Sequence, residues 1–472
     1  GAAGAALDPL RGDWLDYLWE SRRDLALALS ALVRDVAGAP EPFVAVRSAD
    51  PLALHHAAQA VDAAVCDVPL RFLPEPMPLT DPTPLYLAEL ARSAGKPIVD
   101  IGGYTTPPET PPWQEMALLR HFIWRRFWHG ASALGLPPAG RVLAAAPRFM
   151  AEARAVFPIL AARGEEAAPI VLLHPTETLR PLSADRRSEA LAHIVAWWQA
   201  VAAGGVNVAV VPSDKLRLQD LQRARAVLCP LALVVNDGTF ALIEQFVRDG
   251  GVVVTEWGAF AKRDNAGRGR ETRRFLGLQM VMAASLPPSA RLSTGEEIDI
   301  APRPLDGARG ASVELLLAEP YGPRAGSLPV GAVNRCGQGY VYTLLVSLPE
   351  RTRAALLRAI AADHGIGPDL AVTTAGGQEA DRVEAGLRSA GGKRIAVLFN
   401  LGPPRRFVLA FALPVDGALS LRDTLSGGLL HGPSGAPLWS DAELRQGLQV
   451  FLDRGEMAAV IIERADDPAP LV

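Results

Sequence analysis

Residues 238–258, GTFALIEQFVRDGGVVVTEWG, contain a helix, a stop signal and a strand in immediate succession. The first half is helical in pattern, and the pair Gly250 and Gly251 ends the helix. The run Val252, Val253 and Val254 is continuously apolar, which is typical of a strand buried on both faces of a parallel sheet. The stretch therefore predicts a helix that packs on a parallel β-sheet.

The same alternation extends outward from this stretch in both directions. Upstream, the apolar runs APIVLLHP (168–175) and VNVAVVPSD (206–214) are separated by a helical pattern. Downstream, residues 336–349 predict one more strand and residues 350–366 one more helix. We therefore expect residues 151–367 to form a doubly wound α/β domain with a mostly parallel sheet.

The first 150 residues show strands alternating with helices at a similar rhythm. Strands are predicted at 42–48, 64–70, 96–102 and 131–136, and helices at 13–36, 50–65, 85–94 and 113–130. Four such units make half of an eight-stranded (β/α)8 barrel, and half a barrel leaves open sheet edges. We expect residues 1–150 to be the C-terminal half of a barrel whose first half lies outside this chain or comes from another chain.

After about residue 368 the pattern changes to short β-prone segments separated by Gly, Pro and Asp. Examples are KRIAVLFNL (393–401), RRFVLAFALP (405–414) and MAAVIIE (457–463). Regular spacing of such segments is typical of an antiparallel β-sandwich. We assign residues 368–472 to that class.

Composition limits the kinds of partner. The chain has 472 residues, 49% of them apolar and 21% charged, with a net charge of −4, so no basic surplus favours nucleic-acid binding. No apolar run is long enough to cross a bilayer, and we expect no membrane partner. Three widely spaced cysteines form no CxxC motif, which predicts neither a zinc site nor a disulfide framework. The first residues do not resemble a signal peptide, and the localisation stays open.

The stretch ALVVNDGTFALIEQFVRDGGVVVTEWGAFAKRDNAGR (232–268) resembles the middle domain of the glycoside hydrolase family 42 β-galactosidases. That domain mediates trimerisation and has the class I glutamine amidotransferase fold without its chemistry. The segments LRDTLSGGLL (421–430) and RIAVLFNL (394–401) resemble the closing sandwich of the same family. The resemblance implies a glycosidase that hydrolyses terminal β-galactosides or related O-glycosides, needs no metal or other cofactor, and forms a homotrimer.

Retaining glycosidases need two carboxyl groups, one as acid and one as nucleophile. By the resemblance, the acid follows the fourth barrel strand and lies before residue 1, while GKPIVDIGGY (95–104) is the seventh strand. The family's nucleophilic Glu then falls at about Ile101 or Gly102, and neither residue can attack a sugar. The nearest carboxylate is Asp100, and Glu109 in the following loop is the second candidate.

Each candidate has an alternative interpretation. Asp100 suits a turn-capping carboxylate after a strand, and Glu109 suits a solvated loop residue. Tyr104 and Trp113 could stack on a sugar ring at the barrel mouth or pack beneath the loop. Arg47 could line a sugar pocket or form a surface ion pair.

Cys229 is the residue to test for amidotransferase chemistry, because those enzymes use a Cys at a Gly-flanked turn between strand and helix. In AVLCPLALVV (226–235) it lies within an apolar run and precedes Pro230, so a buried structural thiol is favoured. The sequence thus predicts a glycosidase-like protein that is inactive as this chain alone. The alternative is a non-catalytic carbohydrate-binding or assembly subunit.

Overall fold

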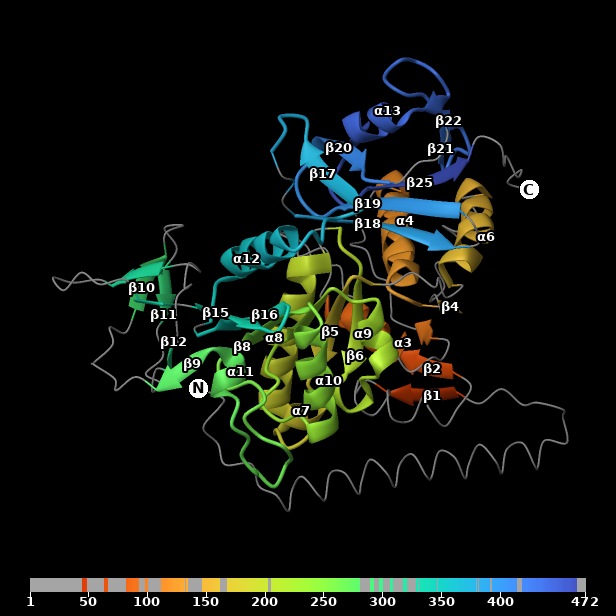
Figure 1. Ribbon diagram of the computed structural model, residues 1–472. Coiled ribbons are helices and arrows are strands. Elements are labelled where there is room, and N and C mark those ends of the chain that lie inside the picture. The colour runs from red at the N-terminus through yellow and green to blue at the C-terminus, as the bar shows by residue number, and fades with distance from the viewer. Residues whose placement is uncertain are drawn as a thin grey trace, which may run out of the picture. The chain divides into compact units, whose positions relative to one another are not determined.

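The computed structural model (Figure 1) describes residues 168–280 and 331–464 with short gaps. Before residue 168 it describes 45–48, 63–66, 82–92, 98–100, 112–131, 133–134 and 147–161, and between 281 and 330 it describes five short strands. Among these residues no helix is long and apolar enough to cross a membrane. The described residues fall into two compact units. The first unit contains 168–201 and 208–366, and the second contains residues from 22–167, 202–207 and 367–472.

The first unit is built on a six-stranded sheet with the order β15-β16-β8-β7-β5-β6. All pairs in it are parallel except β15 with β16, so the prediction of a parallel sheet is confirmed. The strands are β5 (Ile170–His174), β6 (Val208–Pro212), β7 (Ala226–Cys229), β8 (Val252–Glu256), β15 (Gly331–Cys336) and β16 (Gly339–Leu344). The helices are α7 (Thr176–Leu179), α8 (Ala184–Ala202), α9 (Leu218–Gln222), α10 (Asp237–Arg248), α11 (Arg273–Leu276) and α12 (Glu350–Asp363), with a 3₁₀ turn at Ser213–Lys215.

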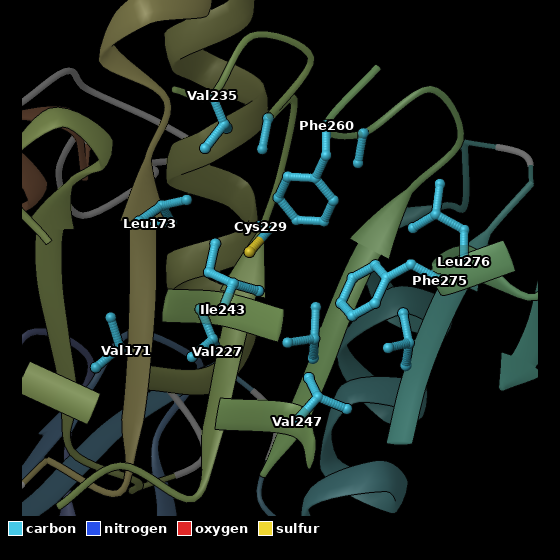
Figure 2. Close-up of a cluster of buried hydrophobic side chains, with 14 of the residues drawn as sticks. Val171, Leu173, Val227, Cys229, Val235, Ile243, Val247, Phe260, Phe275 and Leu276 are labelled. Atoms are coloured by element: carbon cyan, nitrogen blue, oxygen red, sulfur yellow. The ribbon is translucent and has the colours of Figure 1, made fainter. Parts of the chain in front are cut away.

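One face of this sheet packs on α10, the helix of the opening stretch. Figure 2 shows Ile243 and Val247 of α10 facing Val227 and Cys229 of β7. Alternate residues of the strands are buried on the opposite face as well, so a continuous apolar run is what each central strand requires. The side chain of Asn236 caps α10 by accepting a hydrogen bond from the backbone N–H of Thr239 at 2.9 Å.

The Gly pair after α10 has two separate functions. Gly250 takes a φ of +111°, a left-handed conformation that other residues adopt only with strain. A Cβ at Gly251 would lie 2.3 Å from the ring of Phe246. The helix therefore ends at this pair because Gly250 adopts a left-handed conformation and Gly251 leaves room for the ring of Phe246.

The segment between β8 and β16 differs from the prediction, which placed no strands there. It forms β9 (Leu278–Met280) to β14 (Leu328–Pro329), all antiparallel, with β10 (Ser289–Leu292), β11 (Glu297–Asp299), β12 (Asp306–Ala308) and β13 (Leu317–Pro320) between them. These strands have two to four residues each, too short to show a hydrophobic period. Gly337 and Gln338 form the turn of the β15–β16 hairpin.

The second unit begins with four strands, β1 (Ala45–Ser48), β2 (Ala63–Cys66), β3 (Ile98–Asp100) and β4 (Ala133–Leu134), paired in parallel and in sequence order. Their helices are α3 (Thr83–Arg92) and α4 (Pro112–Trp128), and α6 (Pro147–Ala161) follows β4. The predicted helix at 13–36 lies outside the described residues. Residues 63–65, which we assigned to the end of a helix, are part of β2.

The rest of the second unit contains two antiparallel sheets, β17-β20-β24 and β18-β19-β25-β21-β22, with β23 also paired to β21. Their bounds are β17 (Leu370–Thr374), β18 (Val383–Ala390), β19 (Lys393–Asn400), β20 (Arg405–Phe411), β21 (Leu419–Asp423), β22 (Leu429–Leu430), β23 (Leu438–Trp439), β24 (Leu448–Leu452) and β25 (Met457–Arg464), with helix α13 (Asp441–Gln446) before β24. One apolar cluster joins residues of the two sheets, and another joins β19 and β25 to α4 and α6. The larger sheet is therefore the middle layer of three.

Candidate functional site

Asp100 is the last residue of β3, which lies within the strand predicted at 96–102. It pairs in register with Cys66 on β2 and with Leu134 on β4. The side chain of Asp100 lies outside the described part, as do Ile101, Gly102, Tyr104 and Glu109. The nucleophile assignment therefore stays a prediction.

Arg47 belongs to a different row of the same sheet. It pairs with Val65, and Val65 pairs with Val99, the residue before Asp100. Because neighbouring residues of a strand alternate between the two faces of a sheet, this pairing does not group Arg47 with Asp100. Trp113 lies in the first turn of α4, and its side chain is outside the described part.

The helices that precede and follow β3 in the sequence contribute to a buried charged site. His129 follows the end of α4, with its Nδ1 3.3 Å from Oε1 of Glu89 on α3. Its Nε2 is hydrogen-bonded to Oε1 of Glu384 on β18. Arg125 donates to Oε2 of Glu384 from Nε at 3.0 Å and from Nη2 at 2.5 Å. Arg388 donates to Oε1 of Glu89 at 3.1 Å. We call Glu89, Arg125, His129, Glu384 and Arg388 the α3–α4–β18 cluster.

A second buried ion pair lies nearer the start of α4. Arg120 donates to both carboxylate oxygens of Glu152 on α6, at 2.8 and 2.6 Å, and to the backbone oxygen of Met457 at 3.1 Å. The hydroxyl of Thr424 also donates to Glu152. α4 is thus fixed at two points to other segments of the second unit.

Burial and charge act in opposite directions on these groups. Burial by itself would raise the pKa of Glu384, but the charges of Arg125 and His129 outweigh it and hold the pKa well below its usual range. Burial and the neighbouring Arg125 lower the pKa of His121 to about 3, so that imidazole is neutral near neutral pH. Glu384 is therefore a permanent anion near neutral pH, suited to holding cations and not to donating a proton.

In the first unit, polar side chains gather where the parallel strands end, the edge at which doubly wound sheets bind ligands. Glu256, at the end of β8, accepts the backbone N–H of Leu231 at 3.0 Å and lies 2.7 Å from Nε2 of His193. Burial would raise the pKa of Glu256, but the hydrogen bond and charge of His193 lower it. Glu177 in turn is bonded by Ser213 and by Asn236, the latter at 2.8 Å. These carboxylates bind neighbouring groups of the same unit.

Cys229 is fully buried in the apolar cluster of Figure 2. That burial raises the pKa of its thiol well above the ordinary value, which removes the thiolate a nucleophile needs. The interpretation as a structural thiol is confirmed. Within the described part of the chain, no group of three or more His, Cys, Asp and Glu residues could hold a metal ion.

The sequence analysis missed the α3–α4–β18 cluster. A signal was present, because α4 carries charged residues such as Arg125 among apolar and aromatic ones, His129 follows its end, and β18 carries Glu384. Sequence spacing could not pair them, since more than 250 positions separate Glu384 from both.

Residues 176–285 match the model of the β-galactosidase trimerisation domain. The chain resembles the β-galactosidases of glycoside hydrolase family 42. The structure is similar to the β-galactosidase of Bacillus circulans sp. alkalophilus, with a TM-score of 0.68 at 17% identity over 96% of this chain and 68% of that one. For the β-galactosidase of Rahnella sp. R3 the TM-score is 0.70 at 15% identity, and the match covers 98% of this chain and 69% of that one.

A third similar structure has a different substrate in its description. It is a GH42 exo-carrageenase from Bacteroides ovatus, with a TM-score of 0.60 at 10% identity. The match covers 98% of this chain and 57% of that one. A comparison with curated proteins found no match. At these identities the likenesses show the fold alone.

Proposed function

We propose that this chain is part of a family 42-type glycosidase that hydrolyses terminal β-galactosides or related O-glycosides. The observation that carries the proposal is the match of residues 176–285 to the trimerisation domain of β-galactosidases. The shared fold over nearly the whole chain supports it. The exo-carrageenase among the similar structures is the reason for including related glycosides in the substrate class.

We further propose that residues 1–150 are the C-terminal half of the glycosidase barrel. Four parallel strands that follow one another in sequence order support this assignment. The similar β-galactosidases extend beyond the matched part, since this chain covers 68 to 69% of them. The general acid then comes from a segment before residue 1, and this chain alone hydrolyses no glycoside. General acid catalysis typically contributes about 100- to 10,000-fold in rate.

Two carboxylates compete for the role of nucleophile. Asp100 ends β3, whereas the family's Glu falls one or two positions later, at Ile101 or Gly102. This displacement is also the observation that favours the second candidate function, a non-catalytic carbohydrate-binding or assembly subunit. The two functions predict different results for the same assay.

The experiment measures hydrolysis of aryl β-galactosides and related aryl glycosides by the protein that includes the segment before residue 1. Matched variants are Asp100→Asn and Glu109→Gln. Turnover that falls more than about 100-fold in one variant identifies the nucleophile. Absence of turnover on every substrate, with sugar binding retained in calorimetry, supports the non-catalytic function.

The trimerisation match also predicts the assembly. We propose a homotrimer formed through the first unit. Sedimentation equilibrium or light scattering gives the mass directly, and a monomer at micromolar concentration would contradict the assembly while leaving the glycosidase proposal intact.

A further inference from the structure

The small sheet β17-β20-β24 has one packed face and one outer face, and β17 and β20 lie side by side in it (Figure 1). Its packed face contributes residues such as Phe407, Leu409 and Leu448 to an apolar cluster. Because neighbouring residues of a strand point to opposite faces, the residues between them form the outer face. These are Ala371 and Thr373 of β17, Arg406, Val408 and Ala410 of β20, and Gln449 and Phe451 of β24. We call this set the β20 face.

Phe451 is the most prominent residue of the β20 face. Its side chain is 58% exposed, the highest value among the large apolar side chains in the part of the chain that the structure describes. It pairs across the strands with Arg406, and the exposed Gln449 lies two residues away on the same strand and face. An open aromatic ring on a rigid sheet can stack on the apolar C–H face of a sugar ring, while its polar neighbours bind the hydroxyls.

The rest of the β20 face is low and carries hydrogen-bonding groups. Gln449 pairs with Val408, and Val408 pairs with Thr373, so an amide and a hydroxyl lie in one row across the sheet. The next row contains only the methyl side chains of Ala410 and Ala371. Amide and hydroxyl groups both donate and accept, as sugar hydroxyls do. The face is therefore a platform suited to an extended sugar chain.

The charge of the β20 face is positive. Arg406 is exposed, and its side chain forms no hydrogen bond or ion pair with another described residue. None of the residues in β17, β20 and β24 is acidic. The turn after β24 carries Asp453 and Glu456, but Arg454 lies between them and Glu456 accepts the backbone N–H of Asp453 at 2.9 Å. Arg406 is thus complementary to an anionic ligand group, which a guanidinium binds through paired N–H donors.

We propose that the β20 face binds an anionic polysaccharide, a sugar chain that carries sulfate or carboxylate groups. Phe451 stacks on one sugar ring, and Gln449 and Thr373 form hydrogen bonds with hydroxyls. Arg406 binds the anionic group. The inference goes beyond the proposed function, because this binding cleaves no glycosidic bond and is measured without turnover.

The test is isothermal calorimetry of the full chain with three polymers. κ-Carrageenan is a sulfated galactan, polygalacturonate carries carboxylates, and soluble agarose oligosaccharides are neutral. At least one anionic polymer should bind about tenfold more tightly than the neutral one, since hydrogen bonds to charged groups are the stronger ones. The preferred anionic polymer identifies sulfate or carboxylate as the anion. Affinity should fall between about 50 and about 300 mM salt, because salt screens exposed charges.

Equal or tighter binding of the neutral polymer, or absence of binding to both anionic polymers, would overturn the proposal. So would an affinity for the anionic polymer that does not change with salt.

Two variants locate the binding. Phe451→Ala and Arg406→Gln should each weaken binding of the anionic polymer by about tenfold, through loss of the stacking surface and of the charged donor. Arg406→Gln should also reduce the salt dependence. The matched controls are Leu429→Ala, a side chain 43% exposed on the other sheet, and Arg268→Gln, an exposed arginine of the first unit. Both controls should bind as the wild type does, and equal losses in variants and controls would contradict the site.

Measurements of fold and mass complete the experiment. All four substitutions are at exposed positions, so the melting temperatures should stay close to that of the wild type. Light scattering distinguishes a sugar site from a contact between copies of the chain. A lower mass of Phe451→Ala with unchanged polysaccharide binding would assign the β20 face to such a contact and overturn the proposal.

Discussion

Two central strands, β8 in the first unit and β19 in the second, are both runs of mostly apolar residues, but their neighbouring strands run in different directions. β8 lies between parallel neighbours, and β19 lies between the antiparallel strands β18 and β25. Antiparallel strands usually alternate, because one face meets water. β19 does not alternate, because Ile395, Val397 and Phe399 face α4 and α6 while Ala396 and Leu398 face the second sheet. A continuous apolar run thus indicates that both faces of the strand are covered. It does not indicate whether the neighbouring strands are parallel or antiparallel.

The helices that cover these sheets are attached in different ways. α10 meets its sheet through apolar side chains such as Ile243 and Val247. α4 adds two buried ionic sites to its apolar contacts, one at Arg120 and one at Arg125. Buried charges are costly to desolvate, and an apolar contact of the same size can stabilise as well. The buried ion pairs fix the position of α4, because each guanidinium satisfies its hydrogen bonds in one arrangement only.

The largest expected effect concerns the helix layer on β19. Phe399→Ala should destabilise the protein by about 3 to 5 kcal/mol, as is usual for a fully buried phenylalanine. Leu398→Ala, on the opposite face of the same strand, should cost about 2 to 5 kcal/mol. Chemical denaturation measures both. A near-zero effect at Phe399 beside a large effect at Leu398 would show that the helix layer does not cover β19.

Glu384→Gln should cost about 3 kcal/mol, because it leaves the buried guanidinium of Arg125 without its anion. The folded pKa of Glu384 lies below the unfolded value, so its contribution is complete at neutral pH. It is lost progressively as the pH falls below about 4.3, the ordinary value for Glu. Denaturation between about pH 3 and pH 7 should therefore show a smaller acid loss in the variant than in the wild type.

The matched control for that prediction lies on α10. Glu244 forms an exposed ion pair with Arg248, and Glu244→Gln should change stability by less than about 0.5 kcal/mol. Equal effects of the two substitutions on stability would show that the buried ion pair of α4 holds its helix no better than the exposed ion pair of α10.

A smaller effect is expected where β16 meets the end of α10. A Cβ at Gly339 would lie 2.1 Å from the backbone oxygen of Gly251 and 2.4 Å from that of Val247. Gly339→Ala should therefore cost about 1 to 3 kcal/mol through forced backbone shifts. In Gly376→Ala the nearest atom would be 3.8 Å away, and the melting temperature should hardly change. Similar thermal shifts in both variants would contradict the close approach.

The smallest perturbation is chemical and leaves the fold intact. Cys336 is partly exposed and Cys229 is fully buried with a raised pKa, so an alkylating reagent at about pH 8 should label Cys336 first. Mass spectrometry of tryptic peptides gives the order, and denaturant should make Cys229 react. Early labelling of Cys229 in the native protein would show that the apolar cluster of the first unit opens easily.

The sequence by itself determined the main elements and their class. Apolar runs such as Val252–Val254 predicted the parallel sheet, and Gly250–Gly251 marked the end of α10, because these signals are local and rest on burial and on backbone conformation. Cys229 was assigned correctly for the same reason, since its apolar neighbours adjoin it in the sequence. The strand around Asp100 was also predicted, but its end was placed at residue 102, two positions beyond the end of β3.

Only the tertiary structure decided which distant residues meet. Periodicity showed that β19 is buried on both faces, but not that α4 and α6 cover one of them. It gave no sign that Glu384 would meet Arg125 and His129, because a charge in an apolar segment does not specify its partner. Short strands such as β10 and β13 form through pairing with neighbouring strands and are too short to show a hydrophobic period. Local chemistry fixes the elements, whereas side-chain complementarity across hundreds of residues fixes the charged links between them.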